Sequence, residues 1–168
     1  MGAVVKLIDA TIFLFLVVIV VGAPLIDSQI CLPPSIFPNF LIDLKNRYTS
    51  EFGDYFFTNT PHFFVGMVWL QLLFQWSLAL LNLYGILGSK SWFKTTCLMY
   101  GVSVISTMVP ILSELLWSGK ASDKMIMAYS PFMGLGVLAT LRGLLPHPTT
   151  KTTSTDGKKP PLSRKKRV

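Results

Sequence analysis

The chain has 168 residues, of which 51% are hydrophobic and only 14% are charged. Soluble domains carry about 25% charged residues, and long stretches of this sequence have almost none, so a soluble globular protein is excluded. The net charge of +7 does not indicate a nucleic-acid partner, because seven of the fifteen basic residues follow Pro146 and the rest of the chain is almost neutral.

Four segments are long and apolar enough to cross a bilayer as helices, which takes about 20 residues. Their interiors hold one charge, Asp9, in the first segment, none in the second and Glu114 in the third. The fourth has Arg142 near its end, where a long side chain can extend to the interface. The predicted spans are residues 7–25, 63–87, 95–117 and 125–145. The sequence therefore predicts an all-α fold, an integral membrane four-helix bundle formed by residues 1–145.

The first connection, residues 27–61, is the only long one between the spans. We expect it to be irregular, with a short amphipathic helix around residues 40–48. The two later connections are too short to hold a domain. Residues 146–168 contain mainly Thr, Lys and Pro with few apolar side chains, so a disordered basic tail is expected.

Loop charge predicts the orientation of the spans, because cytosolic loops carry an excess of Lys and Arg. The connection at residues 88–94 has Lys90 and Lys94 and no acid, and the tail is strongly basic. Both are therefore expected in the cytosol, with the N-terminus, while the acidic connection at residues 27–61 lies in the lumen. One alternative is that the first segment is a cleaved signal peptide, since Lys6, the apolar run and Gly22-Ala23 fit loosely.

Polar side chains inside the predicted spans are expensive in lipid and are the first candidates for a functional site. Gln71 and Gln75 are four residues apart and share a helix face. The third span carries a similar polar face, formed by Ser103, Thr107, Pro110 and Glu114. With Asp27 at the end of the first span and Tyr129 in the fourth, these residues predict a polar-edged cavity. The alternatives are that they only hydrogen-bond neighbouring helices, and that Glu114 is solvated near the lumenal surface.

Signatures of catalysis are scarce in this sequence. It has no glycine-rich phosphate loop, no Cys/His spacing for a metal and no G-x-S-x-G, so neither catalytic residues nor a cofactor or metal are expected. Cys31 falls in a loop and Cys97 in an apolar segment, so we expect no disulfide between them.

Several short motifs together resemble the sigma-2 receptor family, also called transmembrane protein 97. Asp27-Ser28-Gln29 followed by Leu32-Pro33 is similar to its D-x-Q-x-x-L-P stretch, and Glu51-Phe52-Gly53-Asp54 to its E-F-x-D. The remaining matches are Phe74-Gln75, Pro110-Ile111-Leu112-Ser113 and Tyr129-Ser130-Pro131. Each motif is weak alone, but their order and spacing along residues 7–145 make the resemblance fairly specific. The family is part of the EXPERA superfamily, together with the emopamil-binding sterol isomerases.

The resemblance implies a four-helix protein of the endoplasmic reticulum with a ligand cavity that opens sideways to lipid. Members of the family bind sterols and cationic amphiphilic drugs and influence cholesterol trafficking. By this resemblance Asp27 pairs with the ligand amine and Asp54 supports the cavity. Gln75, Thr107 and Tyr129 match other pocket positions, and Glu114 is a further candidate for support.

One departure from the family concerns Gln71, which stands where the family has a glutamate that can share a proton with the aspartate. An amide cannot act as an acid or a base, but it can donate a hydrogen bond to Asp27. A non-catalytic sterol, lipid and cationic-amphiphile binding protein is therefore expected. The alternatives are a sterol double-bond isomerase, which needs a poised proton donor and acceptor, and a membrane-protein quality-control or assembly factor. A homodimer is left open.

The chain ends in Lys165-Lys166-Arg167-Val168, which fits the K-K-x-x pattern that coat proteins read on cytosolic tails. Such a signal is an address read by a receptor, so endoplasmic-reticulum residence is predicted, with coat proteins as partners of the tail. The alternative is a generic polybasic tail attracted to anionic lipid.

Overall fold

The computed structural model describes residues 2–145, and every element within that range is helical. The first span is α1 (Gly2–Leu25), which runs into the short 3-10 turn η1 (Asp27–Ile30). The second consists of α4 (His62–Leu70), the π-helical turn η3 (Gln71–Gln75) and α5 (Trp76–Leu87). The third and fourth are α6 (Phe93–Trp117) and α7 (Asp123–Leu144). All four are long and apolar enough to cross a membrane, so the predicted all-α membrane bundle is confirmed.

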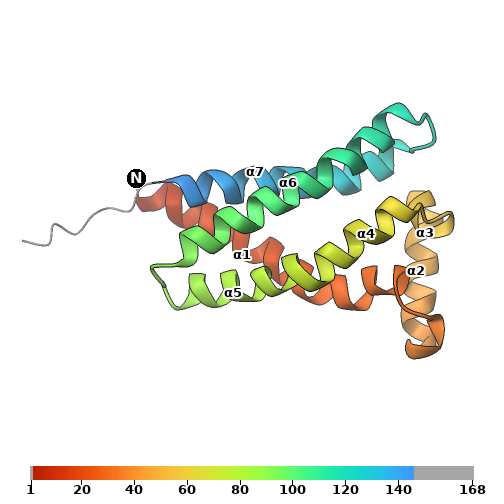
Figure 1. Ribbon diagram of the computed structural model, residues 1–168, viewed down its shortest axis with the longest axis horizontal. Coiled ribbons are helices and arrows are strands. Elements are labelled where there is room, and N and C mark those ends of the chain that lie inside the picture. The colour runs from red at the N-terminus through yellow and green to blue at the C-terminus, as the bar shows by residue number, and fades with distance from the viewer. Residues whose placement is uncertain (1, 146–168) are drawn as a thin grey trace, which may run out of the picture.

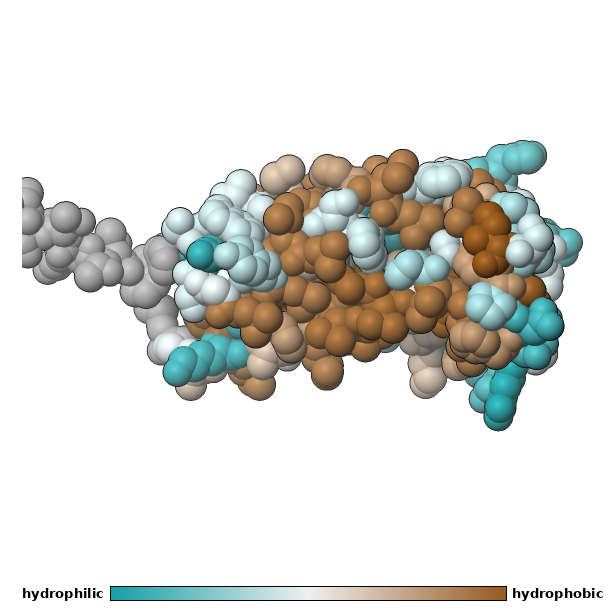
Figure 2. All heavy atoms as spheres, turned by 90° about the horizontal axis from the view of Figure 1, so that it is seen from below, coloured by the Kyte–Doolittle hydropathy of each residue, from teal (hydrophilic) through white to brown (hydrophobic). Residues whose placement is uncertain are grey.

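The spans run along the long axis of the molecule (Figure 1). The start of α1, the connection between α5 and α6 and the end of α7 share one end, called here the basic end because Lys6, Lys90 and Lys94 lie there. Figure 2 shows a wide apolar band between hydrophilic ends. Large apolar side chains such as Leu14 and Leu73 are 66% and 68% exposed, as expected of a surface that faces lipid.

The connection between the first two spans is mostly helical, which corrects the expectation of an irregular loop. It contains the 3-10 turn η2 (Pro34–Ile36), α2 (Asn39–Phe52) and α3 (Tyr55–Thr58), and residues 34–58 are called the cap. The predicted amphipathic helix is present but longer, and it ends at Gly53, whose φ of +67° is the left-handed conformation that favours glycine. In Figure 1, α2 lies across the ends of the spans, which form the capped end.

Arg142 does not extend to the interface, which corrects a second expectation. Its Nε and Nη2 donate to the two carboxylate oxygens of Asp9 at 2.5 and 3.0 Å, and its guanidinium lies 5.3 Å from the centre of the Phe93 ring. The Arg142 side chain is only 11% exposed. Each charge thus finds its partner inside the protein, and the bidentate pair joins α1 to α7 near the basic end.

Helices α6 and α7 pack backbone against backbone along much of their length. A Cβ atom at Gly101 would lie 2.5 Å from the Thr140 nitrogen and 2.7 Å from the Gly136 oxygen, which no real contact allows. Small residues at a membrane helix interface permit this close approach. The pair therefore forms one wall of the bundle, with α1 packed against α5 and α5 against α6.

The packing of α6 on α7 gives a first prediction. Gly101→Ala should lower the free energy of unfolding by about 1–3 kcal/mol, because the new methyl forces two backbones apart. Gly134→Ala is the matched control, since nothing lies within 4 Å of its added Cβ. Thermal unfolding in detergent measures both variants, and it is monitored by the reaction of the buried Cys97 thiol with a fluorogenic maleimide after the partly exposed Cys31 has been changed to Ser. Equal midpoints for the two variants would contradict the packing argument.

Candidate functional site

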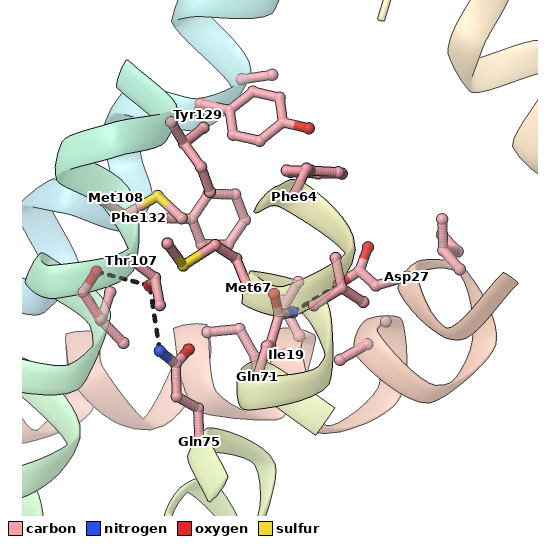
Figure 3. A pocket seen from close by; sticks show the side chains of 18 of the residues that line it. Ile19, Asp27, Phe64, Met67, Gln71, Gln75, Thr107, Met108, Tyr129 and Phe132 are labelled. Atoms are coloured by element: carbon pink, nitrogen blue, oxygen red, sulfur yellow. Dashed lines mark hydrogen bonds between the residues drawn. The ribbon is translucent and has the colours of Figure 1, made fainter. Parts of the chain in front are cut away.

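A cavity of about 380 Å³ lies between the four spans and reaches the cap. This is within the range of small-molecule sites, which are mostly apolar with a few placed polar groups. Its apolar lining includes Ile19 of α1, Phe64 and Met67 of α4, Met108 of α6 and Phe132 of α7. Figure 3 shows these side chains surrounding one space, with the polar groups at its edges.

The first polar group of the cavity is the pair formed by Asp27 and Gln71. Asp27 is held in η1, where the chain tightens after Pro24, and Gln71 begins the π-helical turn. The Gln71 Nε2 donates to the Asp27 Oδ2 at 2.6 Å (Figure 3). Both residues line the cavity, so a carboxylate with an amide donor beside it faces an apolar space.

The second polar group comes from the other end of the same turn. The Gln75 Nε2 donates to the Ser103 Oγ and to the Thr107 Oγ1, each at 3.1 Å. Thr107 in turn donates to the Val104 carbonyl at 2.9 Å. Gln75 and Thr107 are buried and line the cavity, so this group ties the second span to α6.

The π-helical turn sends the two glutamine side chains to different neighbours. Gln71 reaches η1 on the side of the first span, whereas Gln75 reaches α6. A π turn is wider than an α turn and is frequent at functional sites. The sequence Gln71-Leu-Leu-Phe-Gln75 contains neither Gly nor Pro, so nothing in it indicated this turn.

Asp54 supports the cavity from outside its lining. Its Oδ2 accepts from the Tyr129 hydroxyl at 2.9 Å and from the Tyr48 hydroxyl at 3.4 Å, and its Oδ1 accepts from the Phe56 amide at 3.0 Å. Burial raises the pKa of this carboxyl, and the hydrogen bond from Tyr129 partly opposes the rise. Both tyrosines line the cavity, so Asp54 fixes two wall residues, one from the cap and one from α7.

The cap is attached on both sides of the cavity. On the first side the Gln29 Nε2, in η1, donates to the Leu41 carbonyl of α2 at 3.1 Å. On the other side three contacts link the cap to the region around the connection between α6 and α7. These are Ser122 Oγ to the Phe52 carbonyl at 2.7 Å, Tyr55 to Ser118 at 3.3 Å and Tyr129 to Asp54 at 2.9 Å. The cap therefore spans the capped end of the cavity.

The structure brings most of the residues predicted from sequence into one place. The cavity is lined by Asp27, Gln71, Gln75, Thr107 and Tyr129. Glu114 is not part of the lining and is half-buried near the end of α6, because helical periodicity fixes a face but not the depth at which a cavity ends. Lys165 and Lys166 lie outside the described residues.

Sequence reasoning missed two tyrosines that line the cavity, Tyr48 and Tyr100. Tyr48 ends the short amphipathic helix that was expected in the first connection, but nothing in that pattern indicated a contact with the cavity. Tyr100 lies seven residues before Thr107, on the same helix face, and this spacing was a usable signal. Among the described residues there is no group of three or more metal-ligating side chains.

Comparison with known proteins relates the chain to one family and to curated relatives that share one name. Residues 40–142 match the family described as EXPERA (EXPanded EBP superfamily). The chain is 30% identical over 94 residues to "Sigma intracellular receptor 2" of Xenopus tropicalis, which covers 55% of each chain. It is 32% identical over 92 residues to the protein of that name from Homo sapiens, covering 54% of this chain and 52% of the relative. The aligned part therefore spans about half the length of these curated relatives.

The contacts of Asp54 give a second prediction. Tyr129→Phe should lower the free energy of unfolding by about 1–3 kcal/mol, because it removes a donor from a fully buried carboxyl group. Tyr48→Phe is the matched control and should cost less, since its hydrogen bond of 3.4 Å is long. Thermal unfolding in detergent measures both. A larger loss for Tyr48→Phe would contradict the assigned role of Tyr129.

Proposed function

Because the chain belongs to the EXPERA superfamily, we propose that it binds sterols and cationic amphiphiles in its cavity and does not convert them chemically. That the chain is a sterol-related membrane protein follows from the family and from the four spans. The observation that carries the proposal is the Asp27 carboxylate, which faces an apolar cavity with the Gln71 amide donating to it.

Asp27 is suited to hold a cationic group. An amide that donates to one oxygen stabilises the ionised carboxylate and leaves the other oxygen for a ligand. Two opposite charges attract each other more strongly beside an apolar cavity than in water, because the effective dielectric constant is lower there. A ligand with an ammonium group and an apolar body therefore matches both the charge and the lining.

The groups that line the cavity support the proposal that the ligand is not converted chemically, because few of them can give or take a proton. Moving a double bond in a sterol requires protons to be given and taken at two ring positions by positioned groups. Among the described residues Asp27 is the one carboxylate that lines the cavity, and the whole second span, residues 62–87, carries no charged side chain. Gln71 can donate a hydrogen bond but cannot exchange a proton with a substrate.

We place the proposed binding protein in the endoplasmic-reticulum membrane, with both termini in the cytosol and a role in sterol homeostasis or trafficking. The positive charges of the basic end support this orientation, because such loops stay in the cytosol. The capped end then faces the lumen. The two lysines of the tail, Lys165 and Lys166, are the proposed contact for coat proteins.

The counter-ion role of Asp27 gives a third prediction. Asp27→Asn should nearly abolish binding of a radiolabelled cationic amphiphile to purified protein and affect neutral sterols less. Gln71→Leu should weaken binding by about 5- to 20-fold, because the carboxylate loses its donor. Gln71→Glu should be tolerated, since a shared proton can replace the amide hydrogen bond, but affinity should then depend more strongly on pH.

The matched control for these variants is Asp43→Asn, which removes an exposed acid on α2 outside the cavity. It should leave the affinity for the labelled amphiphile unchanged. If Asp27→Asn binds the cation as tightly as the wild type, Asp27 is not the counter-ion and the proposed mode of binding fails.

Residence in the endoplasmic reticulum gives a fourth prediction. Changing Lys165 and Lys166 together to Ser should let the protein move onward, as seen by fluorescence microscopy against markers of later compartments. Changing Lys158 and Lys159 to Ser removes the same charge but leaves the last four residues intact, and it should not alter localisation. Equal redistribution of both variants would show that charge matters and the motif does not.

A further inference from the structure

The cavity has one end that lies farthest from the cap and toward the basic end of the bundle, called here the far end. On each of three spans one lining residue lies farthest from the cap: Val18 on α1, Gln75 on η3 and Tyr100 on α6. Tyr100 precedes Ser103 by three residues, which places the two on neighbouring positions of one helix face. Because Ser103 accepts from Gln75 at 3.1 Å, Tyr100 and Gln75 belong to the same end of the cavity.

Two polar atoms at this far end have no partner among residues 2–145. The Gln75 amide nitrogen is used by Ser103 and Thr107, whereas its Oε1 accepts no hydrogen bond from a described residue. Tyr100 is 1% exposed, and its hydroxyl forms no hydrogen bond with a described residue. The one fully enclosed side-chain atom without a partner in this range is the Gln29 Oε1. Both residues line the cavity, so these two atoms belong to side chains that a ligand in it would contact.

Leaving such groups without partners is costly. Burying a hydroxyl or amide oxygen without a hydrogen bond costs about 1–3 kcal/mol of free energy relative to leaving it in water. The lipid around the bundle supplies no partner. Groups of this kind are expected to be satisfied by something that enters the cavity. Tyr100 offers a donor and Gln75 offers an acceptor, which together match one hydroxyl group.

We propose that the far end of the cavity is a second polar subsite, which takes a hydroxyl group of the ligand. The Tyr100 hydroxyl donates to the ligand oxygen, and the ligand hydroxyl donates to the Gln75 Oε1. This inference rests on the proposed function and narrows it, because the ligand becomes an elongated amphiphile with an ammonium group at Asp27 and a hydroxyl group at the opposite end. A ketone can only accept and leaves Gln75 unpaired, and an apolar end leaves both groups unpaired.

The test uses three rigid probes that differ at one position. They are sterols with an amine in the side chain that carry at the ring end a 3β-hydroxyl, a 3-keto group or no oxygen. Each displaces a radiolabelled cationic amphiphile without a hydroxyl group from the full chain in lipid nanodiscs. The wild type should bind the hydroxyl probe about tenfold more tightly than the probe without oxygen, with the ketone between them.

Tyr100→Phe tests the residue that donates. Its hydroxyl bonds no described residue, so its removal should leave folding unaffected. The variant should bind the hydroxyl probe about 5- to 10-fold more weakly and bind the probe without oxygen as the wild type does. Tyr84→Phe is the matched control, because Tyr84 is 57% exposed and does not line the cavity; it should change neither affinity.

The outcomes separate this inference from the proposed function. If the labelled amphiphile does not bind the wild type, both fail. If it binds through Asp27 but the three probes have equal affinity, the far end does not bind a ligand hydroxyl group and the subsite is overturned. An equal loss for all probes in Tyr100→Phe would also overturn it. Should that variant not fold, the ranking of the three probes on the wild type decides alone.

Discussion

The structure depends on one constraint: a polar group inside a membrane has to find its partner within the protein. The chain meets this constraint in pairs that each join two segments distant in sequence. Asp9 meets Arg142 near the basic end, and Gln75 meets Ser103 and Thr107 in the middle. Asp27 meets Gln71 near the cap. Each pair removes the free-energy cost of leaving its own polar atoms without a hydrogen bond, and it fixes the relative position of the two segments that it joins.

The cavity exists because these contacts are spread unevenly along the bundle. Helices α6 and α7 pack closely through Gly101 and its neighbours, and α1 packs on α5. At the capped half, α4 is joined to the other wall mainly through aromatic side chains of the cap, such as Phe56, which stacks on Phe64 and contacts Tyr129 edge to face. The lining of the space left between the walls is mostly apolar. Its polar groups are those whose hydrogen-bonding capacity is not fully used by contacts between helices. The proposed binding of a ligand thus depends on incomplete pairing.

The sequence was sufficient for the fold, because lipid excludes charge and the four apolar segments are unmistakable. It also predicted most of the cavity, since Asp27, Gln75, Thr107 and Tyr129 matched a known family pattern and Gln71 shares a helix face with Gln75. Three features were not predicted from the sequence. The π-helical turn depends on tertiary contacts that no local residue marks. The pairing of Asp9 with Arg142 joins residues 133 positions apart, although two opposite lone charges in separate spans were a clue. Glu114 lies on the predicted polar face of α6 but outside the cavity lining, because helical periodicity identifies a face and not the depth at which a cavity ends.

The two-sided attachment of the cap has a consequence for the order in which the chain is assembled. The cap is synthesised before α6 and α7, yet Ser118, Ser122 and Tyr129, which hold it, belong to the last part of the bundle. Until the fourth span has been inserted, Asp54 lacks the Tyr129 donor, and the cap is held by the contact from Gln29 and the stacking of Phe56 on Phe64. A nascent chain that stalls after the third span therefore has an Asp54 carboxyl group without its Tyr129 donor and a cap without its contact to Ser122, a state that differs plainly from the finished protein.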